Sequence, residues 1–465
     1  MSDPFLHAHH VAQRIFNISG KLTPVSIKDQ MIRARLFVDR AAENGEISEA
    51  PNQGLLVIGG GACGITAALR ALELGVPATV LEKSPRLFLL QESCTTRWLD
   101  PFQYDWPLEH WAAGRFPLSG AASMPLSFSP GPGPQVTQDW WLDLRAARAA
   151  LAPSLSIHVQ AQLAAAAPIS HTAPNPFVTV QYTTSAGPQS ASFGGVLVTS
   201  GFGTEKTRVG ASFRGFPFWE TDPLGRGNCG LPRATPARVV ISGGGDGALQ
   251  DFLRITTGMQ SAKEVFQACG IPASIAVALK DVERRTACAY HWGEHAGHDH
   301  GLHMELEQEH RRQVGIALGT PRVIANLRGL LVNRPKTLTL VHVCQHLTPF
   351  YGLNRFLTLL IAEYLRQVDE LLVIHPQTGV TGVVSSGSSH VCAADPHICH
   401  GVPHEVEFSA WGSCKDTSAG PTPWQQSVQR DHHSSRDLRD RSGVWVADTG
   451  RAASTGAAVL PRGVT

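Results

Sequence analysis

Three glycines near the N-terminus have the spacing of a dinucleotide-binding turn. Gly59, Gly61 and Gly64 follow the apolar run LLVI and precede the amphipathic run ITAALRALELG. In such a turn the first glycine permits a tight bend, the second lets the backbone approach a pyrophosphate, and the third lets the helix pack on the strand. The phosphates then lie at the positive end of the helix dipole. The pattern therefore predicts a site for a pyrophosphate-linked dinucleotide.

An acidic residue stands where such a site needs one. Glu82 ends the next predicted strand, in the run VLEK, about 20 residues beyond the glycines. A carboxylate there accepts hydrogen bonds from the adenosine ribose, and its charge disfavours a 2′-phosphate, so the site suits FAD or NAD rather than NADP. The alternative is a glycine turn that binds no nucleotide. The agreement of strand, turn, helix and acid favours binding.

A second glycine-rich turn, GGGDGA, contains Gly243 and Gly245 between the runs RVVIS and LQDFLRI. It predicts a second dinucleotide site, with alanine at the helix-packing position. Residues 257–333 look mostly helical and are long for a crossover, so a second nucleotide is left open. If the run ASIAVAL is the next strand, basic residues beyond it can read a 2′-phosphate and favour NADPH, although the same residues fit an exposed helical face. They are Lys280, Arg284 and Arg285.

These motifs resemble the FAD-dependent pyridine nucleotide oxidoreductases with two dinucleotide-binding domains, which include thioredoxin reductase-like and flavin monooxygenase-like enzymes. In that superfamily an Ala-Thr-Gly-like turn leads out of a β-meander, and the run VLVTSGFG places Gly201 there. A late strand ending in a Gly-Asp-like pair approaches the flavin, and GVWVADTG offers Asp448 and Gly450. For Asp448 a simple turn is an equal alternative. The resemblance implies FAD at the first glycine turn and NAD(P)H at the second.

The stretch SCTTRWLDPFQYDWPLEHW lies where the superfamily approaches the flavin ring. The resemblance implies that Arg97 holds a phosphate or an anionic flavin. Three aromatic residues either line a pocket beside it or pack under a loop: Trp98, Trp106 and Trp111. The nine cysteines contain no CxxC pair, which disfavours a disulfide relay, so the flavin is expected to react directly with substrate or oxygen. No catalytic acid or base is assigned.

Two further groups of polar residues carry weaker signals. Histidines that can share a helix face or gather in a loop are found at His291, His295, His298, His300, His303 and His310, and a second group contains His397, Cys399, His400 and His404. Nothing fixes a ligand set in either group, so no metal site is predicted. The run CQHLTPFYGLNRF follows a predicted strand end and either contacts substrate or nicotinamide or only marks a turn. Its candidates are His346, Tyr351, Asn354 and Arg355.

The elements that must position these residues define an α/β fold with two Rossmann-like dinucleotide-binding domains, a β-meander and a helical insertion. We expect an N-terminal helical extension over residues 1–53 and the first part of an FAD-binding domain over 54–205. An NAD(P)-binding-like domain is expected over 236–345, with the helical insertion at about 257–333. Residues 346–465 are expected to return to the FAD-binding domain.

Composition limits the partners. The 39 Lys and Arg residues nearly balance the 38 Asp and Glu residues, so no bulk charge favours nucleic acid or an anionic membrane. No apolar run of about 18 residues and no secretory-type N-terminus occurs, so a cytoplasmic protein is expected. The expected partner is a small-molecule substrate, and the oligomeric state stays open.

The sequence therefore predicts an FAD-dependent oxidoreductase that NAD(P)H reduces and that acts on a small molecule, with monooxygenation as one form of the reaction. One alternative is a flavin oxidase that takes electrons from an amine or amino acid and needs no nicotinamide. Another is a non-catalytic flavin-binding sensor or interaction protein.

Overall fold

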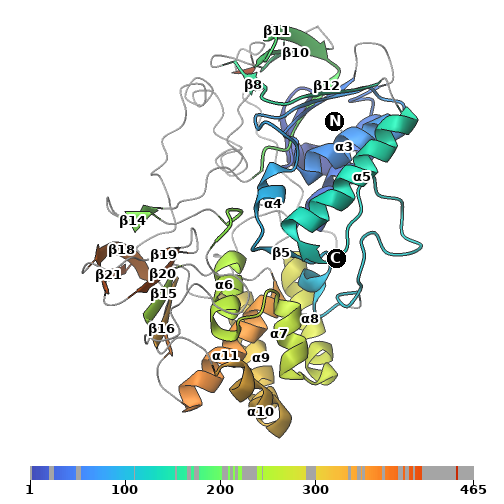
Figure 1. Ribbon diagram of the computed structural model, residues 1–465. Helices are drawn as coiled ribbons and strands as arrows, with labels where there is room; N and C mark the ends of the chain where they lie inside the picture. The colour runs from blue at the N-terminus through green and yellow to red at the C-terminus, as the bar shows by residue number, and fades with distance from the viewer. Residues whose placement is uncertain are drawn as a thin grey trace.

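The predicted apolar strands assemble into two main sheets in the part of the chain that the computed structural model describes (Figure 1). Figure 1 draws the unit built on the first sheet at the top and the unit built on the second sheet at the bottom. The structure describes residues 3–19, 26–48, 54–108, 110–151, 154–164, 169–171, 177–201, 208–209, 213–214, 218–222, 238–242, 245–289, 300–332, 337–342, 347, 351–368, 372–376, 378–385, 391–392, 397–401, 404–410 and 447–448.

The first sheet has the order β1-β2-β12-β3-β4-β7, and its neighbouring strands are parallel except for β1 and β2. The strands are β1 (His10–Ala12), β2 (Ile15–Asn17), β3 (Leu55–Ile58), β4 (Ala78–Leu81), β7 (Leu155–His158) and β12 (Gly195–Val198). Helix α3 (Ala62–Glu73) joins β3 to β4, which is the predicted βαβ unit. Because the strands are parallel, the carboxyl ends of β2, β12, β3 and β4 share one edge of the sheet with the first glycine turn.

The N-terminal residues contribute more than the predicted helical extension. Helices α1 (Pro4–His9) and α2 (Ile27–Glu43) are present, but β1 and β2 lie between them and extend the first sheet beside β12. Strands of three residues are too short for their periodicity to be visible in the sequence. Helix α2 begins at a capping box, in which the hydroxyl of Ser26 accepts from the Asp29 N–H and the Asp29 carboxylate accepts from the Ser26 N–H.

A β-meander lies above the first sheet in Figure 1, as the sequence predicts. It contains β8 (Gln162–Leu163), β9 (Ile169–His171), β10 (Val178–Thr184) and β11 (Gly187–Phe193). Strand β22 (Ala447–Asp448) pairs in parallel with β9, so this C-terminal stretch returns to the first unit. The first unit also contains α4 (Leu89–Ser93), β5 (Trp98–Leu99), η1 (Gln103–Asp105), β6 (Gly131–Pro132) and α5 (Gly133–Leu151).

The second sheet has the order β17-β16-β15-β20-β19, with β15, β16 and β17 parallel and β20 antiparallel to β15. The strands are β15 (Arg238–Ser242), β16 (Thr337–His342), β17 (Leu372–Pro376), β19 (Val391–Cys392) and β20 (His397–Gly401). Smaller pairs are formed by β13 (Arg208–Val209) with β14 (Phe213–Arg214), and by β18 (Thr378–Ser385) with β21 (His404–Ala410).

The crossover between β15 and β16 carries the predicted helical insertion. It runs through α6 (Asp246–Thr257), α7 (Ala262–Cys269), α8 (Ala273–Ala289), α9 (His300–Leu318) and α10 (Pro321–Leu330), and α11 (Gly352–Val368) then joins β16 to β17. The α/β class with a meander and a helical insertion is therefore confirmed. Of the two alternatives for ASIAVAL, the structure shows the helix, because these residues lie within α8. An apolar run of this length cannot distinguish a buried strand from a buried helix.

Of the described elements within residues 346–465, β22 pairs with β9 of the first unit, whereas α11, β17 and β20 belong to the second unit. Two parallel strands need a crossover element, and α11 supplies it between β16 and β17. The boundary after residue 345 therefore cuts through a βαβ unit.

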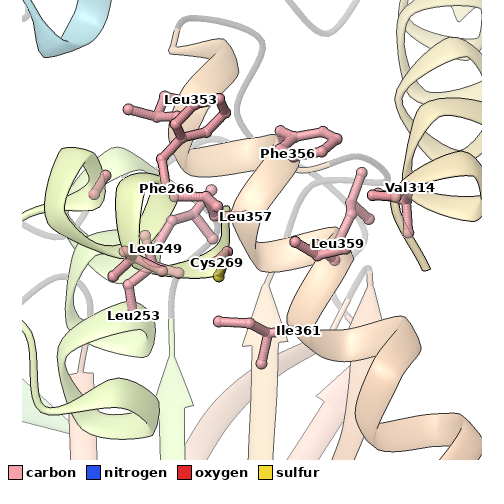
Figure 2. Packing of buried hydrophobic residues seen from close by; sticks show 14 of the residues in the cluster. Leu249, Leu253, Phe266, Cys269, Val314, Leu353, Phe356, Leu357, Leu359 and Ile361 are labelled. Atoms are coloured by element: carbon pink, nitrogen blue, oxygen red, sulfur yellow. The ribbon is translucent and has the colours of Figure 1, made fainter. Parts of the chain in front are cut away.

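The core of the second unit forms between α6, α7, α9 and α11 (Figure 2). Figure 2 shows the apolar side chains of α11 pointing toward α6 and α7 on one side and toward α9 on the other. The labelled residues are Leu249, Leu253, Phe266, Cys269, Val314, Leu353, Phe356, Leu357, Leu359 and Ile361. Within the described residues, every helix is too short or too polar to cross a membrane.

Candidate active site

Two of the three glycines in the first glycine turn are sterically constrained, and the third is not. Gly59 has a φ of +117°, and a Cβ there would lie 2.6 Å from the carbonyl oxygen of Thr199. A Cβ on Gly64 would lie 2.0 Å from the carbonyl oxygen of Gly59. A Cβ on Gly61 would meet no described atom within 4 Å. The first and third glycines are therefore required by the fold, whereas the second borders open space.

The open space lies in front of the N-terminus of α3. Gly61 is the N-cap residue, and among the described residues no side chain caps the helix. Its first turn contains no acid, so the first N–H groups and the positive end of the helix dipole face this space. The Thr199 hydroxyl holds the turn in place by donating to the Ile58 carbonyl (3.0 Å). This arrangement fits a pyrophosphate.

Glu82 lies beside the same turn. Its Oε2 accepts from the Gly60 N–H (2.6 Å) and its Oε1 accepts from the Ser84 N–H (2.7 Å). These bonds fix the half-buried carboxylate, and an ionised carboxylate has further lone pairs that can accept from ribose hydroxyls. The residues present therefore fit a dinucleotide whose adenosine ribose carries free hydroxyls, as FAD does.

The other predicted residues of the first site are placed less completely. Gly201 follows β12 with a φ of +79°, a left-handed conformation that favours glycine. Asp448 lies opposite His171 in the pairing of β22 with β9, and its side chain lies outside the description, as does Gly450. Strand β22 is thus part of the meander sheet, whereas the strand that pairs with β12 in the first sheet is β2. Contact of Asp448 and Gly450 with a flavin therefore stays a prediction.

Arg97 belongs to a buried ion network rather than to an open anion site. Its guanidinium pairs with both oxygens of Asp251 and lies 3.3 Å from Asp222, and Arg254 pairs with the same two acids at 2.9 Å. The Phe218 ring stacks on Arg97 at 4.1 Å. All four charged residues are nearly inaccessible to solvent. The sequence predicted that Arg97 holds a phosphate or an anionic flavin. In the structure its charge is instead neutralised by Asp251 on α6 of the second unit.

The aromatic residues after Arg97 pack between the two units. This agrees with the packing alternative of the sequence analysis rather than with the lining of a pocket. Trp106 packs on Phe266 of α7 and Phe356 of α11, with ring centroids 5.8 and 5.4 Å apart, and Trp111 also packs on Phe266. Trp98 lies in β5 and is half-buried.

Polar contacts cross between the units at the same place. Lys263 lies 3.2 Å from Asp100, the Tyr104 hydroxyl binds the Gln250 amide, and the Tyr104 ring stacks on Tyr351 at 4.1 Å. Tyr104, Gln250 and Asp251 were not predicted from the sequence, which gives no signal for contacts between distant segments.

The second glycine turn is described from Gly245 onward, and Gly243 lies outside the described residues. Gly245 is the N-cap of α6, and a Cβ there would meet no described atom within 4 Å. Unlike α3, this helix has an acid in its first turn, Asp246, which accepts from the Asn354 amide (3.1 Å). An anion at this N-terminus would meet the carboxylate as well as the N–H groups.

The predicted readers of a 2′-phosphate lie on α8 instead of at a strand end. Arg285 pairs with Asp281 (3.1 Å) and Glu305 (2.7 Å), and Arg284 is exposed, as the helical-face alternative expects. The strand that does follow the insertion, β16, leads into the run VCQH at residues 343–346, which contains no acidic residue and no Lys or Arg. Neither an NAD-type acid nor an NADP-type base therefore stands at this position.

Two other candidate residues, His310 and Arg355, belong to a buried cluster at the start of α11. Arg355 and His310 both contact Glu283 at 2.5 Å, and all three side chains are buried. Burial, with the Arg355 charge, lowers the pKa of His310 and so favours the neutral form of the ring. Burial raises the pKa of Glu283, but the charges and hydrogen bonds of Arg355 and His310 together outweigh burial, so the pKa is lowered. Arg355 and His310 thus serve the fold of the second unit.

The remaining histidine candidates have no described ligand geometry. His291, His295, His298 and His346 lie outside the described residues, and the side chains of His300, His303, His397, Cys399, His400 and His404 are not described. Within the described residues, no group of three His, Cys, Asp or Glu side chains is placed to hold a metal ion.

No protein-family model and no curated protein sequence matches this chain. Among solved structures, it is similar to bacillithiol disulfide reductase from Staphylococcus aureus at 11% identity and a TM-score of 0.35, over 77% of this chain and 73% of that chain. The Bacillus cereus enzyme of the same name gives 10% identity and a TM-score of 0.37, over 77% and 75%.

The chain is also similar to the ornithine N-hydroxylase of Kutzneria sp. 744, a structure with reduced FAD, NADP⁺ and L-ornithine. The identity is 12% and the TM-score 0.30, over 74% of this chain and 76% of that chain. Because the TM-scores are low, the function proposed below rests on residues of this chain.

Proposed function

We propose that this protein is an FAD-dependent oxidoreductase whose FAD binds at the first glycine turn. The observation that carries the proposal is the contrast between Gly61 and its two partners in the motif. Gly59 and Gly64 are required to close the turn, but the Cβ position of Gly61 is open and borders the uncapped N-terminus of α3. The fold alone does not need glycine at this position, whereas a pyrophosphate lying against the backbone does.

Glu82 supports an adenosine ribose without a 2′-phosphate, and Gly59, Gly61, Gly64 and Glu82 would together hold the ADP half of the cofactor. Bound FAD supplies the capacity to accept and donate electron pairs.

The described cysteines do not support a thiol relay. Burial raises the pKa of the Cys63 and Cys269 thiols to about 12, and burial also raises the pKa of Cys94. Thiols with such values stay protonated near neutral pH and are poor nucleophiles. We therefore propose direct reaction of the flavin with a small-molecule substrate or with oxygen.

Two electron sources are compatible with this proposal. Reduction by NAD(P)H is supported by the second glycine turn, where Gly245 leaves open space at the N-terminus of α6. A nicotinamide-independent oxidase is supported by Asp246 in that first turn and by the uncharged run after β16. We retain NAD(P)H as the main proposal, with the oxidase as the second.

The absorbance spectrum of the purified full-length chain tests both points. Oxidised-flavin bands, or their appearance after addition of FAD, are expected, and their bleaching on anaerobic addition of NADPH or NADH would support the main proposal and identify the donor. Bands that persist with both nucleotides but bleach with an amine or amino acid would support the oxidase. A colourless protein that cannot be reconstituted with FAD would overturn the proposed function.

A further inference from the structure

Polar side chains gather at the end of β2, on the edge of the first sheet that also carries the first glycine turn. In the sheet, Asn17 of β2 lies opposite Val198 of β12, and Val198 lies opposite Ile58 of β3. Because these three strands are parallel, Asn17 ends β2 at the edge where Gly59 follows β3. Neighbouring strands lie about 4.8 Å apart, so the end of β2 is roughly 10 Å from the end of β3.

The proposed FAD extends across these strand ends. Glu82 follows β4 and the glycine turn follows β3, so the ADP half lies over two neighbouring strands. The strand order reverses between β3 and β12, and a dinucleotide binds across the sheet at such a point. Past the end of β12, a Cβ on Gly201 would meet no described atom within 4 Å, so open space continues beyond the glycine turn. The ribityl chain and flavin ring therefore extend toward the end of β2.

Asn17 is buried, and its side chain is folded over the end of the strand. The side-chain oxygen accepts from the Ser19 N–H (2.8 Å), and the backbone carbonyl of Asn17 lies 3.3 Å from Nδ1 of His9. These two contacts fix the residue and turn its amide toward the strand end. The other atom of that amide, Nδ2, makes no hydrogen bond to a described residue, so a fixed donor is available to a molecule bound at this edge.

Ser19 supplies a second polar group at the same place. Its buried hydroxyl donates to the Val198 carbonyl (3.3 Å), which leaves the hydroxyl oxygen able to accept. The residues from Asn17 to Ser19 carry no charge, so they suit hydroxyl groups better than a phosphate. A polyol such as the ribityl chain both donates and accepts hydrogen bonds, and a donor from Asn17 beside an acceptor from Ser19 matches both needs.

We propose that the end of β2 binds the ribityl chain of FAD, with the Asn17 amide donating to one hydroxyl and the Ser19 hydroxyl accepting from another. His9 is a positioning residue, because it holds the Asn17 carbonyl. This inference rests on the proposed function. It gives the N-terminal strand a role on the flavin side of the site that the sequence predicted for Asp448, whose strand β22 pairs with β9.

The test compares FAD with ADP, which contains the adenosine and the pyrophosphate but neither the ribityl chain nor the ring. Both are titrated by calorimetry into the full-length chain freed of flavin, as the natural chain and as the variant Asn17→Ala. Asn44→Ala is the matched control, because it removes the same amide from the same N-terminal segment. Asn44 is exposed and donates to the Arg40 carbonyl at the carboxyl end of α2.

We expect Asn17→Ala to weaken FAD binding about fivefold or more with ADP binding unchanged, and Asn44→Ala to bind both like the natural chain. Unchanged FAD affinity in Asn17→Ala would overturn the inference while leaving the proposed function intact. An equal loss for FAD and ADP would overturn it as well, because Asn17 would then act through the fold. Failure of the natural chain to bind either FAD or ADP would instead overturn the proposed function.

Two further variants identify the group that Asn17 contacts and keep the inference testable if Asn17→Ala does not fold. Asn17→Asp still accepts from the Ser19 N–H and can accept from a ribityl hydroxyl, so its FAD affinity is expected to stay within about threefold of the natural chain. A loss as large as that in Asn17→Ala would exclude a hydroxyl partner. Ser19→Ala keeps the backbone N–H and is expected to weaken FAD binding about threefold without affecting ADP. Unchanged FAD binding in Ser19→Ala would exclude Ser19 as a ligand.

Discussion

Removal of the Arg97 guanidinium is expected to destabilise the joint between the two units. Arg97 and Arg254 balance the charges of Asp222 and Asp251 in a cluster that solvent barely reaches. In Arg97→Met two buried carboxylates share one guanidinium, so the cluster carries a net negative charge. Breaking one side of a buried ion pair in this way costs about 3–5 kcal/mol.

The double variant Arg97→Met with Asp251→Leu separates charge imbalance from loss of packing. It removes one charge of each sign and leaves the pair of Arg254 with Asp222, whose two contacts are 2.9 and 3.0 Å. Buried pairs replaced by apolar side chains are often nearly neutral in free energy. We therefore expect the double variant to lose about 2 kcal/mol less than the sum of the two single variants.

Urea unfolding followed by tryptophan fluorescence measures these differences, because Trp106 is buried at the same joint. Arg366→Met is the control: its pair with Glu363 is exposed, so no measurable change in the free energy of unfolding is expected. Additive losses in the double variant would refute the reasoning. An Arg97→Met protein that unfolds like the natural chain but no longer binds FAD would refute it as well and return Arg97 to the cofactor site.

The remaining predictions concern the glycine turn, a buried histidine and a tyrosine. Gly61→Ala is expected to weaken FAD binding about tenfold, while the free energy of unfolding of the apoprotein falls by less than about 1 kcal/mol. Gly64→Ala is expected to lower the free energy of unfolding by about 1–3 kcal/mol, because its Cβ overlaps a carbonyl oxygen. Equal stabilities of the two variants in chemical denaturation would contradict this expectation. Burial, with the Arg33 charge, lowers the pKa of His9 from 6.5 to about 3. The unfolded chain therefore binds this proton first, and stability falls as the pH drops from 6.5 toward 3, by up to about 1.4 kcal/mol per unit. His9→Gln is expected to flatten that part of the stability profile, and an unchanged slope would exclude His9 as the cause. Tyr104→Phe leaves the Gln250 amide without its hydroxyl partner and is expected to cost about 1–3 kcal/mol in urea unfolding; no loss would mean that another group takes over the bond.

Local patterns predicted the first βαβ unit well, because strand, turn and helix are encoded within a short stretch. Gly59, Gly64 and Glu82 lie where the spacing placed them, since each acts on atoms a few residues away or on the adjacent strand. The same reasoning left ASIAVAL open, because an apolar run of this length fits a helix and a strand equally, and the structure shows a helix.

Assignment of roles to single charged residues was less successful. Arg97 has the type and place of an anion ligand, but Asp251, 154 residues later, takes its charge. Arg355 stands at the start of a helix after a strand, yet Glu283 pairs with it in the core of the helical insertion. Pairings across such distances depend on how the elements pack, which no periodicity records.

By itself, the sequence determined an α/β chain with a dinucleotide turn near Gly59, a β-meander and a helical insertion, because hydrophobic periodicity and glycine spacing are local consequences of backbone geometry. Only the tertiary structure decided that β2 lies beside β12 in the first sheet, that residues 97–111 join the two units, and that Arg97 pairs with Asp251. Burial and charge pairing are properties of the packed whole, and they decide which charged side chains are left to meet a ligand.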